Sequence, residues 1–236
     1  MKTETMERGF LGYGDPKEAK YWFVGPEEAG SAEQVIFREE VWTELGCKPL
    51  LDVQDFHLLL ARKPGCGTMS RLFSGDQSLI QRTWRDLIRL TLSFENSGNV
   101  DDDTESIGNF QARRLSKEAM LLECRGGQDT FIRPDRVLEE ATCERGQLIR
   151  DLIKENKPAL VVFYGVIACD QAGMFGEMAI GRLDVTTDQG RAFTFRYGAT
   201  DDTVIGLAPH PNARGLQASH WRSFGRVLRG VRPRAF

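Results

Sequence analysis

The sequence predicts an α/β fold, a three-layer α/β/α sandwich around a central and mostly parallel sheet. Short apolar segments alternate with long helical patterns, and strands separated by helices need crossover connections, which favour parallel pairing with helices on both faces. The 236 residues are enough for one sizeable core and few for two. With 41% hydrophobic and 28% charged residues, the composition excludes disordered, collagenous and disulfide-scaffold proteins.

The elements are assigned in chain order. Strands are predicted at residues 21–24, 50–53, 106–110, 160–164, 183–187 with 192–197, and 204–207. Helices are predicted at residues 32–45, 78–92, 134–155, 167–178 and 217–228. In the third helix, Leu148, Ile149, Leu152 and Ile153 recur at helical spacing, and Pro134 suits a first helical turn. One domain is expected over residues 1–236, with its core at about 20–230.

Residues 95–105 contain five acids and almost no apolar side chain, which predicts a solvated surface insertion rather than a metal site or a linker. The five cysteines form no CxxC pair, so neither a disulfide framework nor a zinc site is expected. Residues 1–14 contain no apolar stretch that could serve as a signal peptide, so none is expected, and no segment approaches the roughly 20 apolar residues of a membrane span. We expect a soluble, cytoplasmic protein without a metal or a cofactor.

The first motif with chemical meaning is the end of the strand at residues 21–24. Gly25 and Pro26 follow this strand directly. Two carboxylates, Glu27 and Glu28, come next, before Ser31 begins a helix. Ligands of open parallel sheets bind at such strand ends. A GxGxxG fingerprint is missing, and two acids would repel a pyrophosphate. A simple helix cap explains Ser31 but not the carboxylates.

The second motif follows the strand at residues 204–207. His210 lies between two prolines, which restrict the backbone and present the imidazole on a stiff support at a strand end. This setting favours a chemical role for His210. The other histidines, His57 and His220, lack it and are expected to be structural.

The third motif is Asn109, at the end of the strand predicted at residues 106–110. Its amide offers a donor and an acceptor, which suits the imide or amide edge of a nucleobase, although a turn-forming Asn is an equally good interpretation.

The C-terminal end of the chain is basic. Residues 213–236 contain six arginines and no acid. Trp221, Phe224, Val227 and Leu228 form an apolar stripe, so the arginines are expected on the outer side of a helix and in the tail. They are interpreted either as a basic helix end, which the helix dipole favours, or as a patch that contacts phosphates.

Taken in order, the three motifs resemble those of the uracil-DNA glycosylase superfamily. Its members carry a water-activating loop after the first core strand, an Asn at a middle strand tip, and a His-Pro motif after the last strand. Residues 158–165 also look like its penultimate core strand. The resemblance implies a base-excision repair enzyme that hydrolyses the N-glycosidic bond of a flipped uracil or other deaminated or damaged base. It also implies a monomer that binds duplex or single-stranded DNA through its basic C-terminal region.

The resemblance also implies roles for single residues. It assigns catalysis to Glu27, Glu28 and His210. It assigns base binding to Gly25, Pro26, Phe56 and Asn109, and DNA contacts to Ser70, Asn212, Arg214, Arg222 and Arg226. The acid at Glu27 would stabilise positive charge on the sugar and accept a proton from water, and a neutral imidazole would stabilise the departing base. Both acids depart from the family, which has Asp or Asn and then proline.

Other classes of function stay open. The chain could be a nucleic-acid binder on this fold that uses its arginines without cleavage. It could also be a hydrolase of a free nucleoside or other small molecule that uses Glu27 and His210, or an unrelated α/β protein. Salt-sensitive binding of oligonucleotides distinguishes the two DNA hypotheses from an enzyme that acts on a free ligand.

Overall fold

The fold is described from a computed structural model of the chain. The description covers residues 6–26, 32–74, 79–96, 104–123, 139–165, 181–200 and 202–231. Glu27 and Glu28 lie outside these residues, as do the predicted helix at 167–178 and most of the acidic stretch. Within the described ranges, no helix is both long and apolar enough to cross a membrane.

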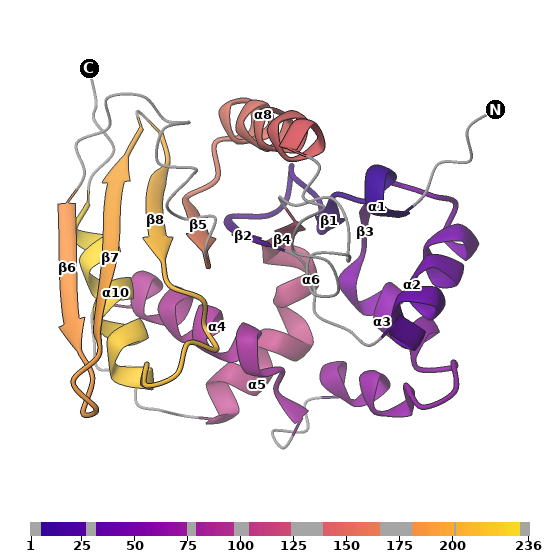
Figure 1. The fold of residues 1–236 in the computed structure, drawn as a ribbon, viewed down its shortest axis with the longest axis horizontal. Coiled ribbons are helices and arrows are strands. Elements are labelled where there is room, and N and C mark those ends of the chain that lie inside the picture. Colours follow the sequence, from indigo (N-terminus) through magenta and orange to yellow (C-terminus); the bar gives the residue numbers. More distant parts are fainter. Residues whose placement is uncertain are drawn as a thin grey trace.

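An eight-stranded mixed sheet forms the centre of the described part of the chain, with the order β3-β1-β4-β2-β5-β8-β7-β6 (Figure 1). Its strands are β1 Gly12–Tyr13, β2 Tyr21–Gly25, β3 Leu50–Leu51, β4 Ala119–Glu123, β5 Leu160–Tyr164, β6 Gly181–Thr186, β7 Ala192–Ala199 and β8 Val204–Ala208. The central strands β4, β2, β5 and β8 are parallel, and β6 and β7 add an antiparallel hairpin at one edge. The predicted α/β class with a mostly parallel sheet is confirmed.

Strand β2 shows that the sheet is buried on both faces. All five of its residues are buried, and successive side chains alternate between two cores. Tyr21 and Phe23 belong to the core on one face, whereas Trp22 and Val24 belong to the core on the other. A continuous apolar run is typical of a parallel strand covered on both sides.

Helices form a layer on each face of the sheet (Figure 1). Helix α8 (Glu139–Asn156) covers one face through Ile149 and Ile153. The other layer contains α3 Val53–Leu60, α4 Arg82–Glu95, α5 Thr104–Arg113 and α10 Ala218–Gly230. The described residues also form α1 Met6–Gly9, α2 Ala32–Glu44, α6 Leu115–Glu118 and the 3-10 helix η1 Gly67–Phe73. The three-layer sandwich is confirmed.

Helices α4 and α10 approach each other closely because residue 225 is glycine. A Cβ at Gly225 would lie 2.3 Å from the Leu90 carbonyl oxygen. Phe224 and Leu228 of the predicted apolar stripe are buried, and Arg226 is exposed. The predicted amphipathic character of this helix is therefore confirmed.

The strand predicted at residues 106–110 is wrong, because this segment lies in helix α5. Ile107, Phe110 and Gln111 are its buried side chains, and their spacing of three and four residues is helical rather than alternating. The middle strand of the sheet is instead β4, which the sequence analysis missed. The strand predicted at 50–53 is two residues long, since the Asp52 side chain caps helix α3.

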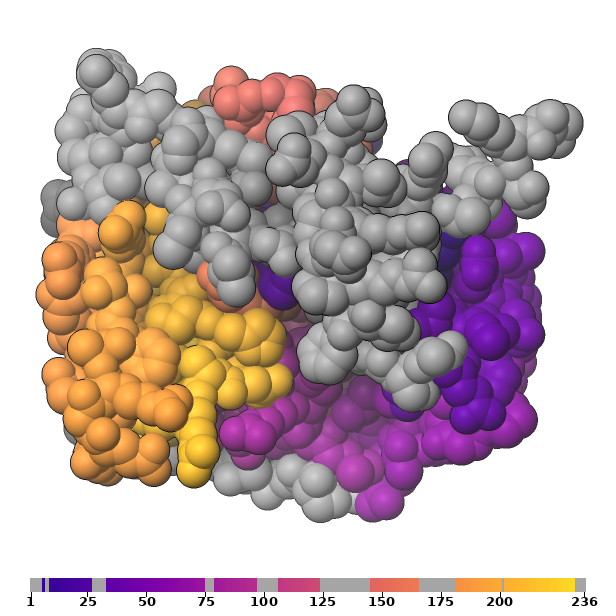
Figure 2. Space-filling model, in the orientation of Figure 1, coloured from indigo at the N-terminus to yellow at the C-terminus, as the bar shows by residue number. Residues whose placement is uncertain are grey.

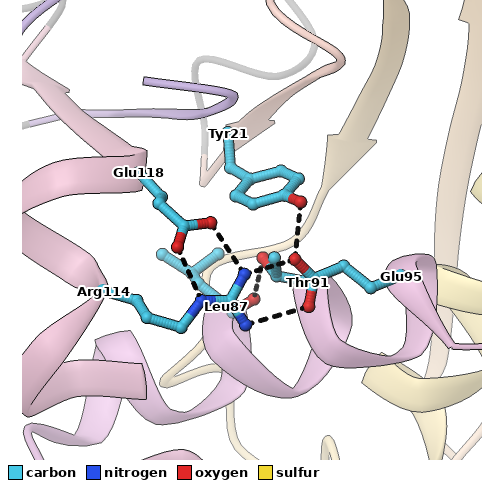
Figure 3. A network of polar contacts seen from close by, with 6 residues as sticks. All are labelled: Tyr21, Leu87, Thr91, Glu95, Arg114 and Glu118. Carbon is cyan, nitrogen blue, oxygen red and sulfur yellow. Dashed lines mark hydrogen bonds and ion pairs between the residues drawn. The ribbon is translucent and has the colours of Figure 1, made fainter. Parts of the chain in front are cut away.

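Glu95 does not belong to a solvated insertion, because it is the last residue of α4 and is partly buried in a polar network (Figure 3). It accepts a hydrogen bond from the Tyr21 hydroxyl at 2.6 Å and is paired with Arg114. Arg114 also binds Glu118 at 2.8 Å. Burial and the bond to Glu95 raise the pKa of Tyr21, and the bond from Arg114 lowers the pKa of Glu118. The network joins β2, α4 and α6 at the amino end of β2.

Candidate functional site

The central strands end together at one edge of the sheet. Gly25, the last residue of β2, pairs in register with Glu123, the last residue of β4. Tyr164 at the end of β5 pairs likewise with Ala208 at the end of β8. A cavity of about 210 Å³ lies at this edge. It occupies the position where ligands of open α/β sheets bind.

The cavity wall combines flat rings with polar groups. Among the described residues, its larger apolar and aromatic residues are Tyr13, Met69, Leu72, Trp84, Leu121, Leu122 and Tyr164. Its polar residues are His57, Gln81, Thr83, Glu123, His210 and Asn212. The yellow C-terminal region and the magenta helix α4, which both contribute to this wall, adjoin on the face shown in Figure 2. Residues far apart in the sequence thus meet at the strand ends.

His210 follows β8 between two prolines and lines the cavity. Its Nδ1 accepts a hydrogen bond from the backbone N–H of Asn212 at 3.1 Å. Since Nδ1 is the acceptor, the proton of the neutral ring is on Nε2, which can donate. Burial lowers the pKa of His210 and so favours the neutral ring.

Tyr164 lies over the end of β2 and beside His210. A Cβ at Gly25 would be 2.2 Å from the Tyr164 ring, so a larger residue at that position would collide with it. The Tyr164 and His210 rings meet edge to face, with their centroids 5.7 Å apart. At Gly165, where φ is +85°, a Cβ would lie 3.4 Å from Pro26 Cδ and 3.5 Å from His210 Cδ2. The residue that precedes the predicted acidic loop is thus placed beside His210.

The loop after His210 is tied to the start of helix α4. The Asn212 side chain donates from Nδ2 to Thr83 Oγ1 at 3.0 Å. Arg214 follows and is exposed. In α10, Arg222 is half-buried and Arg226 is exposed. The predicted DNA-contacting residues of this region thus lie along one stretch of chain that begins at the cavity.

The two other histidines differ in their surroundings. His220 accepts a hydrogen bond at Nδ1 from the Gln217 N–H at 3.1 Å and caps helix α10, which agrees with the predicted structural role. His57 is buried, and its Nδ1 donates to the Val53 carbonyl oxygen at 2.7 Å. His57 nevertheless lines the cavity, a position that the sequence analysis did not anticipate.

Glu123 and Arg38 form an ion pair that the sequence analysis missed. Arg38 of α2 is 3% exposed, and its guanidinium lies 3.3 Å from Glu123 Oε1 and 3.4 Å from the Tyr13 hydroxyl. Arg145 of α8 donates to the Glu123 carbonyl oxygen at 3.4 Å. The sequence does give an indication of Glu123, because it is an acid at the end of an apolar strand, just as Glu27 follows the end of another. No sequence pattern indicates that Glu123 pairs with Arg38, which lies 85 residues away.

Three predicted base-binding residues, Pro26, Phe56 and Asn109, do not line the cavity, whereas Gly25 does. Asn109 is exposed on helix α5 rather than placed at a strand end. Phe56 is 0% exposed and packs against Tyr13, so neither face of its ring is available to a base. Among the described Phe, Tyr and Trp residues, those that line the cavity are Tyr13, Trp84 and Tyr164. No sequence motif fixes the position of Phe56 relative to a ligand.

Ser70 lies in η1, and its hydroxyl donates to the Gly67 carbonyl oxygen at 3.0 Å. Its contact with phosphate stays a prediction, as do the roles of Glu27 and Glu28, which lie outside the described residues. Over the described part of the chain, no group of three His, Cys, Asp or Glu side chains could hold a metal ion.

Comparison with known proteins adds no relative. No protein-family model matches the sequence, and neither the curated proteins nor the solved structures give a significant match.

Proposed function

We propose that this protein is a DNA glycosylase-like hydrolase that cleaves the N-glycosidic bond of a flipped uracil or other deaminated or damaged base. The state of His210 carries the proposal. Its pKa is lowered by burial, and its Nδ1 accepts from the Asn212 amide, which leaves Nε2–H as a fixed donor in the wall of a cavity. A neutral donor of this kind suits a leaving group that gains negative charge.

The chemistry needs one group for each charge that develops. The departing base becomes negative, and a preorganised donor is typically worth about 3–4 kcal/mol of the barrier. The sugar becomes positive, and the attacking water must lose a proton, which a carboxylate can accept. Glu27 is the candidate for that carboxylate, because it follows Pro26, which lies beside His210 with Gly165 between them.

The size and the lining of the cavity support a single base as its occupant. Its volume of about 210 Å³ is below the roughly 300–1,000 Å³ of sites for drug-sized ligands. Aromatic rings in its wall suit stacking on a flat ring that has been turned out of DNA. The exposed Arg214 and Arg226 supply positive charge for the backbone on the chain that leaves the cavity.

The proposal is tested by incubation with duplex oligonucleotides that carry one uracil, hypoxanthine, xanthine or mismatched base, followed by alkali to cut abasic sites. We expect His210→Gln to slow cleavage about 10²–10³-fold, since it replaces the fixed N–H donor of the imidazole by an amide on a flexible side chain that nothing holds in place. Glu27→Gln should have a large effect of the same sign. His220→Gln is the matched control, because His220 caps a helix, and it should leave the rate unchanged.

The alternatives have their own outcomes in this assay. Salt-sensitive oligonucleotide binding without cleavage of any substrate would replace the proposal by a non-catalytic binder. Cleavage of free nucleosides, with no binding of oligonucleotides, would replace it by a small-molecule hydrolase.

A further inference from the structure

The turn after β8 holds the His210 ring through its own backbone. The N–H of Ala213 donates to the His210 carbonyl oxygen at 2.8 Å, and the N–H of Asn212 donates to His210 Nδ1 at 3.1 Å. Both bonds are local, and Asn212 is exposed, so water competes for the same polar groups. A surface turn of this kind is restrained when it is also bound to a more rigid element.

Thr83, in the first turn of α4, supplies such a contact. Its Oγ1 accepts a hydrogen bond from Asn212 Nδ2 at 3.0 Å, across 129 residues of sequence. Thr83, Asn212 and His210 all line the cavity. Asn212 thus binds His210 through its backbone N–H and Thr83 through its side chain. The bond to Thr83 therefore restrains the same residue whose amide faces the imidazole.

The first turn of α4 is itself firmly placed. The Gln81 side chain accepts a hydrogen bond from the Trp84 N–H at 2.8 Å, and the Gln81 N–H donates to Gln111 Oε1 at 3.1 Å. Gln111 also donates from Nε2 to the Leu72 carbonyl oxygen at 2.6 Å, and it is only 2% exposed, so it is shielded from competing water. Thr83 therefore belongs to a support that is bonded to the interior.

We propose that Thr83 is a positioning residue, which holds Asn212 so that His210 keeps Nδ1 as an acceptor and Nε2–H as the donor in the cavity. Thr83 acts through Asn212 rather than by contact with the reacting atoms. The inference rests on the proposed function only for the leaving group that this donor would meet. The state of the imidazole itself is measured without a substrate.

Nuclear magnetic resonance of the ¹⁵N-labelled protein at pH 8 reports the tautomer of each neutral imidazole, and the chain has only three histidines. At His220, Nδ1 accepts from a backbone N–H, as it does at His210. At His57, Nδ1 donates to a carbonyl oxygen. One spectrum thus contains a reference for each tautomer. In the unaltered protein, His210 should match His220, and a match to His57 would overturn the inference.

Thr83→Val keeps the branched shape of the side chain and removes the oxygen that accepts from Asn212. The ratio of the Nε2–H to the Nδ1–H tautomer at His210 should fall about two- to tenfold, the usual net effect of one hydrogen bond. Thr83→Ser keeps the hydroxyl and should restore the ratio. Thr43→Val, the same change at an exposed threonine of α2 outside the cavity wall, should leave it unaltered. An unchanged ratio in Thr83→Val would overturn the inference.

A second variant tests whether Thr83 acts through the Asn212 side chain. Asn212→Ala removes Nδ2 but keeps the backbone N–H, and φ at residue 212 is not positive, so alanine fits the turn. This change should lower the tautomer ratio as Thr83→Val does. The double variant should show no further decrease, because both changes break the same bond. Additive effects of the two changes would contradict this route.

The inference and the proposed function can fail separately, because the spectra require no cleavage. If oligonucleotides are not cleaved but Thr83→Val lowers the tautomer ratio, only the glycosylase activity fails. If uracil is excised and the ratio is the same in Thr83→Val as in the unaltered protein, only the positioning role of Thr83 fails.

Discussion

The hydrogen bond from the Asn212 amide to His210 Nδ1 fixes where the proton of the neutral imidazole lies. Burial acts in the same direction, because it lowers the pKa and disfavours the charged ring. If Nδ1 were protonated, it could not accept the hydrogen bond from the Asn212 amide, and two N–H donors would face each other. The local structure therefore maintains one protonation state and one tautomer, which is what a fixed donor requires.

This arrangement predicts how stability depends on pH. Since the pKa of His210 is lower in the folded chain than the unfolded value of about 6.5, the unfolded state binds more protons between these two values. The free energy of unfolding should therefore fall as the pH decreases below about 6.5 and should level off below the folded pKa. Urea unfolding of the unaltered protein and His210→Gln from pH 7.5 to 5 measures this contribution. It should disappear in His210→Gln and persist in His220→Gln, and a profile that is unchanged by His210→Gln would contradict it.

At the scale of elements, the contact between α4 and α10 depends on one missing side chain. The Gly225 Cα faces the Leu90 carbonyl oxygen and the Ser93 Cβ at distances that leave no room for a methyl group. Backbone atoms cannot move aside as a flexible side chain can. Helix α4 contains Thr83, which accepts the hydrogen bond from Asn212, and helix α10 contains the arginines. The spacing of the two helices therefore affects the geometry of the candidate site.

Gly225→Ala is therefore expected to destabilise the protein by about 1–3 kcal/mol, the usual cost of overpacking. Gly230→Ala, at the end of the same helix, has open space around its Cβ position and should change the free energy of unfolding by less than about 0.5 kcal/mol. Chemical denaturation of both variants gives the comparison. Equal effects would mean that helix propensity, and not the close approach, decides the outcome.

The Arg114 network connects elements at the opposite end of β2 (Figure 3). Arg114 lowers the pKa of Glu118, so this pair stabilises the fold above the unfolded Glu pKa of about 4.3 and loses that contribution as the pH falls through the folded value. Arg114→Gln should destabilise the protein at pH 6 by about 1 kcal/mol, a modest figure because the side chains are partly solvated.

The difference between Arg114→Gln and the unaltered protein should shrink as the pH is lowered from 5 to 3. Arg113→Gln is the control, since Arg113 is exposed and adjacent in the chain. A constant difference over this range would show that Arg114 acts through packing on Phe110, whose ring centroid lies 4.5 Å away, rather than through its carboxylate partners.

At the scale of the whole molecule, the sequence allowed much of the sheet to be predicted. Strands β2, β5 and β8 are continuous apolar runs, which identify strands buried on both faces. Strand β3 is too short for such a pattern. The segment 106–110 is short and apolar enough to suggest a strand, and only the spacing of Ile107, Phe110 and Gln111 indicates helix α5. The positions of Gly25 and His210 could be predicted because both follow directly from the ends of predicted strands.

The remaining part of the site arises only from tertiary packing. The buried Arg38 contacts the partly buried Glu123, which lies 85 residues away in the chain, and no local sequence pattern encodes that contact. Phe56 was expected at a base but is needed in the core between Tyr13 and His57. The composition shows only that aromatic residues are present. Whether such a residue of a helix lines the cavity or packs in the core depends on which side of the helix faces the strand ends.

The activity that we propose for the cavity at the strand ends is hydrolysis of an N-glycosidic bond. It is tested most directly by single-turnover incubation of the protein with base-modified duplex oligonucleotides in ¹⁸O-labelled water, with mass spectrometry of both products. We predict a released free base and one ¹⁸O atom at C1′ of the abasic sugar, with both signals lost in His210→Gln and kept in His220→Gln. Bound but intact oligonucleotides across the whole panel, or release that is unaffected by His210→Gln, would contradict it.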